Sequence, residues 1–203
     1  MKYIACTQCC YVRYSIFQYR IFSVLGNMKQ RSDQQVMRPL DVAVLLKIIT
    51  YGDADWKQQQ ISLNLYLSQS EISKSVARSK YAGLLDETGK HVRRLALMDF
   101  LEKGIAYVFP QRPGAIVRGV PTSHSASPLA ELIQSEENYV WPCASGKLRG
   151  QSITPLYPQA PEAVLQDPEL HALLALVDAL RVGQKREKML AIGELKKRIL
   201  DEK

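Results

Sequence analysis

One segment restricts the fold of this 203-residue chain more than any other: residues 67–85, LSQSEISKSVARSKYAGLL. Ser68 and Glu71 have the spacing of a capping box, which marks the start of a helix. Wound at about 100° per residue, one side of that helix is apolar or small. The residues on that side are Ile72, Val76, Ser79 and Gly83. We therefore predict a short helix that packs closely on a neighbour through this side.

The opposite side of the predicted helix is small, polar and basic, with no acid beyond the first turn. It consists of Ser70, Lys74, Ala77 and Tyr81, flanked by Ser73 and Arg78. Taken alone, this pattern is typical of the solvated side of an ordinary amphipathic helix. The segments that precede it favour a second interpretation, in which this side binds another molecule.

Two further helical patterns come before this segment. Residues 41–52, DVAVLLKIITYG, are apolar almost all round, which predicts a buried helix. Residues 56–67, WKQQQISLNLYL, form a second pattern that ends where Ser68 begins the third, so only a tight turn separates them. Two helices, a tight turn and a helix with a small basic outer side form the helix-turn-helix arrangement. The last helix of that arrangement fits the major groove of DNA.

A Leu-Ser turn leads into this helix, which ends in Ala-Gly-Leu and a further hydrophobic residue. The residues that form this pattern are Leu67, Ser68, Ile72, Val76, Ala82, Gly83, Leu84 and Leu85. It resembles the recognition-helix region of winged helix-turn-helix regulators of the MarR type, over residues 38–90 or about a quarter of the chain. The resemblance implies a DNA-binding domain with groove-facing residues Gln69, Ser70, Ser73, Lys74, Ala77 and Arg78.

In that family a β-hairpin wing follows the recognition helix at once, and this sequence departs from the pattern. Residues 90–104, KHVRRLALMDFLEKG, predict another helix that ends at Gly104. The runs IAYVFP and AIVRGVP, joined by QRPG, predict a hairpin over residues 105–120. It is either a displaced wing, with Arg112 near its tip and Arg118 on its return strand, or a small sheet that closes the core. Further candidates for phosphate or minor-groove contacts are Lys80, Arg93 and Arg94.

The second half of the chain divides into a proline-rich segment and a pair of helices. Residues 121–166 predict an extended connection with short strands, because their prolines preclude long helices. Residues 167–203 predict a helical hairpin, with Asp167 as the N-cap and Pro168 as the first helical residue. This hairpin either covers the core of the first domain or forms a dimerisation surface. Its apolar stripes are Leu170, Leu173, Leu174, Val177 and Leu180, then Met189, Ile192, Leu195 and Ile199.

Residues 1–37 form a basic N-terminal extension, with five Lys or Arg residues and no acid in the first 32 positions. Polar residues interrupt its apolar first part, which matches neither a membrane span nor a signal peptide. We expect translated upstream sequence there, with the functional chain starting at Met28 or Met37, and a strand-forming or partner-binding arm is the alternative. The segment CTQCC contains a C-x-x-C spacing, which can form half of a zinc site, but no second pair of ligands with such spacing occurs elsewhere in the sequence. Its thiols are therefore interpreted as incidental.

The net charge of +7 lies mainly at the two ends of the chain, because residues 33–180 hold fourteen bases and sixteen acids. Within that middle part, residues 74–118 hold nine bases and four acids. DNA phosphates interact with the positive charge close to the binding surface rather than with the net charge of the chain, so this distribution favours a role for the predicted helix in DNA binding.

The sequence contains no dinucleotide-binding glycine motif, phosphate-binding loop, zinc-protease motif or nucleophile elbow. His124, in TSHSAS, is interpreted as a solvated loop residue or a turn former rather than a catalytic one. We expect a mainly α protein with a small β component, and no enzymatic activity, metal or cofactor.

The expected function is sequence-specific binding of double-stranded DNA by a cytoplasmic homodimer, as a bacterial-type repressor. Residues 38–120 would form its winged helix-turn-helix domain. The alternative is a helix-turn-helix module that binds protein, such as an antitoxin or adaptor. If α-helical residues 69–81 contact DNA, replacing Lys74 or Arg78 with Ala should weaken operator binding without lowering the melting temperature.

Overall fold

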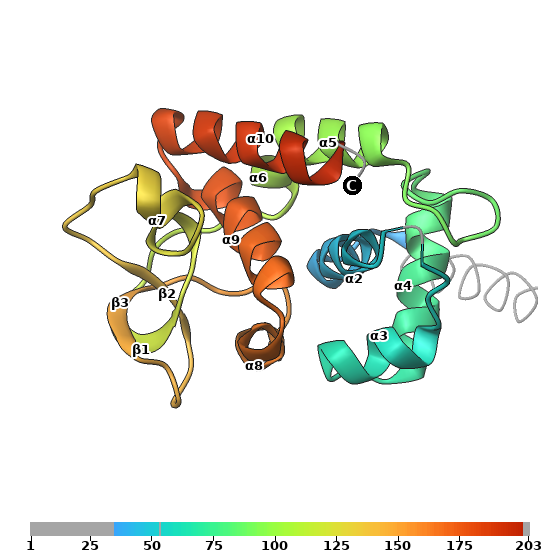
Figure 1. The fold of residues 1–203 in the computed structure, drawn as a ribbon, viewed down its shortest axis with the longest axis horizontal. Coiled ribbons are helices and arrows are strands. Elements are labelled where there is room, and N and C mark those ends of the chain that lie inside the picture. The colour runs from blue at the N-terminus through green and yellow to red at the C-terminus, as the bar shows by residue number, and fades with distance from the viewer. Residues whose placement is uncertain (1–34, 53, 201–203) are drawn as a thin grey trace, which may run out of the picture. The chain divides into compact units, whose positions relative to one another are not determined.

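The computed structural model describes residues 35–52 and 54–200, so the predictions for Cys6, Cys9 and Cys10 and for the start of the chain lie outside the described residues. The described part is mainly helical with a small three-stranded sheet, as the sequence predicts (Figure 1). Its elements in chain order are α2 (Pro39–Thr50), α3 (Gln58–Leu65), α4 (Gln69–Tyr81), α5 (Arg94–Lys103), α6 (Ile105–Val108), β1 (Ile116–Pro121), the 3-10 turn η1 (Ser123–Ser125), α7 (Leu129–Leu132), β2 (Tyr139–Pro142), β3 (Leu148–Ser152), α8 (Ala160–Ala163), the 3-10 turn η2 (Val164–Gln166), α9 (Pro168–Val182) and α10 (Lys185–Ile199).

The long helix α9 lies at the centre of the core (Figure 1). Apolar side chains surround it, and every residue from Ala172 to Arg181 is buried. It packs against α2, α5, α6 and α10 and against the turn η1. Met37–Lys203 accordingly forms one compact unit, in which the helical and proline-rich segments share a single core. The predicted pair of helices α9 and α10 is confirmed, and α9 is part of the core rather than a cover over it.

The three helices predicted before residue 85 are confirmed. Pro39 occupies the first turn of α2, and the residues Asp41–Ile48 are all buried. The helix α3 ends at Tyr66, which has a left-handed backbone with φ of 53°. Two residues later Ser68 caps α4, and its predicted capping box with Glu71 is present. A tight turn therefore joins α3 to α4.

The predicted hairpin over residues 105–120 is wrong. Ile105–Val108 is the short helix α6, because Ile105 is buried in the core and the ring of Phe109 packs edge-on against Phe100. A short apolar run fits a buried helix as well as a strand, so its periodicity alone does not distinguish them. Only the return segment forms a strand, β1, and the partners of β1 lie much later in the chain.

The strands β1, β2 and β3 close on one another as a small barrel. The strand β1 is antiparallel to both β2 and β3, while β2 and β3 are parallel to each other. Glycines allow this close approach. A Cβ atom at Gly119 would collide with the carbonyl group of Trp141, and one at Gly150 would collide with that of Asn138. The glycine of each Arg-Gly dipeptide therefore lies where another backbone segment leaves no room for a side chain.

A buried aspartate on α9 attaches the barrel to the core. Asp178 accepts hydrogen bonds from Trp141 Nε1 at 2.6 Å and from Thr122 Oγ1 at 2.9 Å. It also accepts a hydrogen bond from Arg181 Nη1 at 2.6 Å, one turn along the same helix. Burial raises the pKa of Asp178, and these three donors act in the opposite direction. The barrel is thus bonded to α9 through a carboxylate that no solvent reaches.

Two side chains lie where the sequence did not place them. His124 lies in the turn η1, one of its two predicted alternatives, but it is not solvated. It is only 5% exposed, because its Nε2 lies 2.8 Å from the carbonyl oxygen of Glu137 and its ring lies against Tyr139. Met189, predicted to belong to the apolar stripe of α10, is 65% exposed. Leu195 and Ile199 of that stripe are buried as predicted, together with Ala191.

Candidate nucleic-acid interface

The helix α4 packs on α2 and α3 through small side chains. Ser75 and Ser79 are fully buried beside Ile72, and their size leaves room for the neighbouring helices. At the end of α4, Gly83 has a left-handed backbone with φ of 74°, and the N–H of Leu84 donates to the carbonyl of Ser79 at 2.9 Å. This glycine-dependent end is the one that the Gly-Leu-Leu pattern predicts. The predicted close packing of this side of α4 is confirmed.

Arg78 points into the protein, unlike the other predicted groove-facing residues. It is 4% exposed, and its Nε donates to Asp41 Oδ2 at 2.8 Å while its Nη2 donates to Asp41 Oδ1. Its predicted place on the outer side of α4 is therefore wrong. The carboxylate of Asp41 on α2 is fully buried, and a buried charge is tolerated only with a hydrogen-bonded partner of opposite sign. The partner that Asp41 requires is Arg78.

The remaining predicted residues of α4 face solvent. All of the following are exposed: Gln69, Ser70, Ser73, Lys74, Ala77 and Lys80. Glu71, the one acidic residue of α4, is engaged by the backbone and hydroxyl of Ser68 at the start of the helix. Lys74 and Lys80 have no ionic partner within residues 35–52 and 54–200. The outer side of α4 is therefore small, polar and basic, as predicted from the sequence.

A short hairpin directly follows α4, and we call it the 84–93 hairpin. Leu85 and Val92 form an isolated antiparallel bridge. Next to it, the backbone N–H of Asp86 donates to the carbonyl of His91 at 2.9 Å. The hairpin lies at the end of α4 (Figure 1). In the MarR-type pattern the wing follows the recognition helix at this position, whereas the hairpin predicted over residues 105–120 was either a displaced wing or a small sheet.

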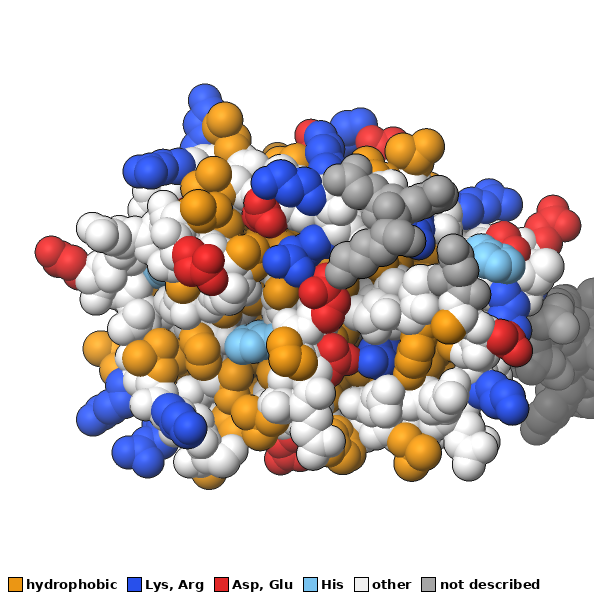
Figure 2. Space-filling view, in the orientation of Figure 1, with side chains coloured by type: hydrophobic (Ala, Val, Ile, Leu, Met, Phe, Trp, Pro, Cys, Tyr) orange, Lys and Arg blue, Asp and Glu red, His pale blue; other side chains and the backbone are white. Residues whose placement is uncertain are grey.

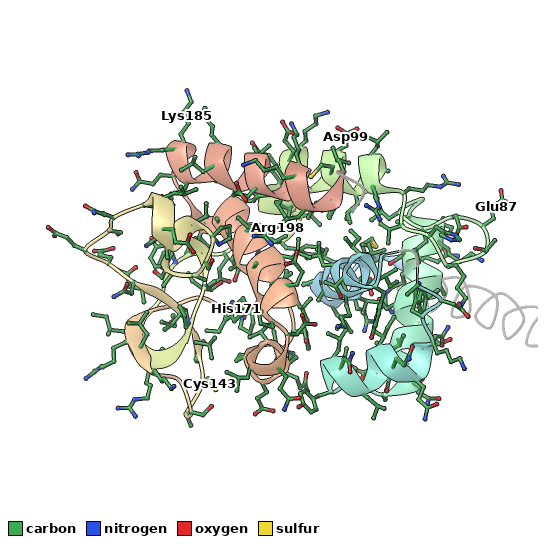
Figure 3. All side chains as sticks on the ribbon, in the orientation of Figure 1. Glu87, Asp99, Cys143, His171, Lys185 and Arg198 are labelled. Carbon is green, nitrogen blue, oxygen red and sulfur yellow. The ribbon has the colours of Figure 1, made fainter. Side chains whose placement is uncertain are left out.

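Asp86 organises the loop of the 84–93 hairpin. Its carboxylate accepts hydrogen bonds from the hydroxyl of Thr88 at 2.6 Å and from the backbone N–H groups of Lys90 and His91 at 2.9 and 3.1 Å. The hydrogen bond from Thr88, together with those from Lys90 and His91, holds the pKa of Asp86 well below its ordinary value. Glu87, at the tip of the loop, points outward into solvent (Figure 3).

Contacts with the rest of the protein fix the position of the 84–93 hairpin. Lys90 Nζ donates to Asp55 Oδ1 at 2.9 Å and to the carbonyl of Trp56 at 2.8 Å. The indole N–H of Trp56 donates in return to the carbonyl of Lys90 at 2.9 Å. In addition, Gly89 lies against the aliphatic part of the Lys80 side chain from α4. The hairpin is therefore bonded to the segment before α3 and packed against α4.

The other predicted contact residues are divided between two regions. Arg93 is exposed at the end of the 84–93 hairpin. Arg94 is half-buried, and its Nη1 donates to the carbonyl of Ile199 in α10 at 3.0 Å. Arg112 and Arg118 are exposed before and on β1, on the opposite side of α2 and α9 from α4 (Figure 1). The structure thus separates the barrel arginines from the α4 surface.

Sequence reasoning missed the 84–93 hairpin and its residues Lys90 and His91. A signal was present in the sequence DETGK, because Asp, Thr and Gly favour tight turns that hydrogen-bond their own backbone. The helix predicted over residues 90–104 began at the last residue of this turn sequence, so the turn was not recognised. The observed helix α5 begins four residues later, at Arg94, which leaves the turn free to form.

A polar cavity of about 350 Å³ lies where the ends of α2 and α3 meet the start of α9. Its charged residues include Lys47 and Asp167, which pair with each other at 2.6 Å. Within residues 35–52 and 54–200, no group of three His, Cys, Asp or Glu side chains is arranged to hold a metal ion. Among the same residues, no helix combines the length and the apolar character needed to cross a membrane.

Comparisons with protein-family models, with curated proteins and with solved structures find no match to this chain. A functional assignment therefore depends on the geometry and chemistry of its own residues. The outer side of α4 and the 84–93 hairpin beside it form the candidate interface with nucleic acid.

Proposed function

We propose that this protein is a sequence-specific DNA-binding regulator that represses transcription by occupying an operator. The helix α4 enters the major groove, and the 84–93 hairpin serves as the wing of a winged helix-turn-helix domain. The outer side of α4 is the observation that supports this proposal. It is exposed, small, polar and basic, and the buried pair of Arg78 with Asp41 fixes the helix that presents it.

The exposed side chains suit different parts of the duplex. Gln69 and the two serines, Ser70 and Ser73, have the donors and acceptors that bond to base edges in the major groove. Ala77 allows the backbone of α4 to come close to the bases. The positively charged side chains of Lys74, Lys80 and Arg93 suit phosphate oxygens. Such phosphate contacts position the helix on the duplex but give no sequence preference.

In this proposal the regulator acts in the cytoplasm. It binds as a homodimer, because a two-fold symmetric protein recognises the two halves of a palindromic site.

A protein-binding module without enzymatic activity, such as an antitoxin or adaptor, is the second candidate. Two large apolar side chains close to the interface favour it. Tyr81 at the end of α4 is 68% exposed, and Leu95 at the start of α5 is 74% exposed. Exposed aromatic and aliphatic side chains of this size occur at protein-binding surfaces.

An anisotropy titration of the full chain against random and genomic DNA fragments, at two salt concentrations, tests the proposal. We expect tight binding of one fragment in the presence of competitor DNA, with an affinity that falls as salt rises. Replacing Ser73 and Lys74 together with Ala should remove this preference at an unchanged melting temperature. Lys185→Ala, which removes an exposed base of α10, is the control and should keep it. Equally weak binding to every fragment would exclude the proposal and favour the protein-binding module.

A further inference from the structure

The barrel places two arginines directly opposite each other. In the register of β1 with β3, Arg118 pairs with Arg149, and both residues are exposed. Residues opposite each other on antiparallel strands project from the same face, with Cβ atoms about 5 Å apart. Like charges at this spacing destabilise a sheet when no opposite charge compensates them. The pair therefore needs an explanation other than stability.

Neither Arg118 nor Arg149 has an ionic partner within the described part of the chain. The buried arginines Arg78 and Arg181 and the half-buried Arg198 differ, because each pairs with a carboxylate. The sequence supplies the reason. Residues 103–130 and 138–161, which include all three strands, contain no Asp or Glu. The strands that carry the arginine pair therefore contribute no acidic side chain beside it.

The surroundings of the pair add positive charge. Lys147 is exposed directly before β3, and Arg112 is exposed before β1. Glu137, an acid just before β2, accepts a hydrogen bond from Gln151 at 3.1 Å. Figure 2 shows Lys and Arg side chains gathered at the lower left, where Figure 1 shows the barrel, with no acidic side chain among them. An anionic ligand that reaches both strands would supply the opposite charge that the strands themselves lack.

We propose that Arg118 and Arg149 form a second DNA-binding site, which binds the phosphodiester backbone without recognising sequence. This inference rests on the proposed function and deepens it. Guanidinium groups bind phosphate oxygens through two parallel hydrogen bonds, so two neighbouring arginines bind adjacent phosphates of one strand. The antiparallel register of β1 with β3, which also pairs Val117 with Gly150 and Gly119 with Leu148, fixes the two arginines opposite each other. The barrel lies across α2 and α9 from α4, so the site engages DNA outside the segment that α4 contacts (Figure 1).

The test compares two double variants of the full chain, each of which removes two positive charges. One is Arg118→Gln with Arg149→Gln, and the matched control is Lys185→Gln with Arg186→Gln at the exposed start of α10 (Figure 3). Binding of a random-sequence duplex is measured by anisotropy over a series of salt concentrations. We expect the slope of log affinity against log salt to fall by about two for the arginine variant, one for each phosphate contact, and to stay unchanged for the control. The melting temperature without DNA should stay constant or rise, because a repulsion is removed.

Equal slopes for the two double variants, or an unchanged slope for the arginine variant, would overturn the second site. The Ser73→Ala, Lys74→Ala variant separates this result from the proposed function. This variant should lose the preference for one fragment. It should keep the part of the salt dependence of binding that comes from the barrel arginines.

A wild-type protein that binds no duplex would contradict the proposed function, and a separate measurement then decides the arginine site. A short single-stranded oligothymidylate is titrated into the wild-type chain while the side-chain Nε–H resonances of arginine are recorded by NMR. Shifts of the Arg118 and Arg149 resonances, absent for Arg186, would support a phosphodiester site by itself. No shift at either residue would overturn it.

Discussion

Two buried aspartates connect the two candidate DNA-binding regions to the core, and they do so in different ways. Asp41 on α2 accepts two hydrogen bonds from one guanidinium, that of Arg78 on α4, and a third from the backbone N–H of Arg38 at 2.8 Å, at the start of its own helix. Asp178 on α9 receives one each from Thr122, Trp141 and Arg181. The first carboxylate thus positions one helix through one ion pair, whereas the second joins several segments through three donors.

The source of the compensating charge is the important difference. At Asp41, the positive charge comes from the helix that carries the candidate interface, so the placement of α4 depends directly on an ion pair between two helices. At Asp178, the positive charge of Arg181 comes from the same helix, three residues along. The links from Asp178 to the barrel are neutral hydrogen bonds from Thr122 and Trp141. Changes of charge should therefore affect the position of α4 more directly than that of the barrel.

The largest effect is expected for Asp178→Ala. This change leaves the charge of Arg181 buried without its carboxylate and leaves the donors of Thr122 and Trp141 without an acceptor. Removing one partner of a buried charge pair costs about 3–5 kcal/mol, and we expect the free energy of unfolding to fall by about 5 kcal/mol in a urea titration. Asp99→Ala, at an exposed ion pair with Lys103, is the control and should change it by less than about 1 kcal/mol.

Asp178→Asn sharpens the comparison, because the amide oxygen can still accept from Thr122 or Trp141. If neutral hydrogen bonds attach the barrel, this variant should lose clearly less stability than Asp178→Ala. Equal losses for the two variants would mean that the ion pair with Arg181 is the dominant contribution at this site.

A slightly smaller effect is expected for Arg78→Ala, because the buried carboxylate of Asp41 loses its ion pair but keeps the hydrogen bond from the backbone N–H of Arg38, and no neutral donor loses its acceptor. We expect a loss of about 3 kcal/mol in the free energy of unfolding. This expectation reverses the prediction from the sequence that the variant keeps its melting temperature. Replacing both partners, Arg78→Met with Asp41→Leu, should recover much of the loss, because well-packed apolar residues often replace a buried ion pair at little cost.

The double replacement also tests which side of α4 matters for DNA. If the outer side binds DNA, the Arg78→Met, Asp41→Leu variant should keep its affinity for the preferred fragment as long as it is folded. A folded variant that loses this affinity would show that Arg78 itself takes part in binding, contrary to its burial.

The sequence predicted the elements whose signals are local. The cap at Ser68 and the end at Gly83 lie within or next to α4, so its bounds could be predicted from a few neighbouring residues. Arg78 lies at the edge of the buried side of that helix, and its direction is decided by Asp41, which is 37 positions earlier in the chain. A helical projection contains no information about such a partner.

The barrel could not be predicted for a related reason. The strand β1 pairs with β2 and β3, and those partners lie beyond an intervening turn and helix, so no hairpin signal joins them. The same long-range pairing brings Arg118 and Arg149 together, although each Arg-Gly dipeptide is unremarkable in its own segment. Burial of His124 likewise depends on Glu137 and Tyr139, which reach it only after the chain has returned.

The smallest effect concerns a third aspartate, Asp86, which is half-buried and organises the loop of the 84–93 hairpin by local hydrogen bonds. Its pKa lies well below the ordinary value of about 3.9, chiefly because of the hydrogen bond from Thr88. A depressed pKa means that the ionised carboxylate stabilises the hairpin at any pH above about 3.9, and that this contribution is lost as pH falls through the lower folded-state value. The measurement uses the His91→Gln variant, because histidine side chains as a class change charge between pH 5 and 8 and this one lies 3.2 Å from Asp86. In that variant the amide resonance of Lys90 should stay constant from neutral pH to pH 4 and shift only below it. Asp86→Asn should remove that shift. A midpoint near 3.9 would mean that Asp86 does not organise the loop, and that Lys90 and Trp56 fix the hairpin beside α4 without it.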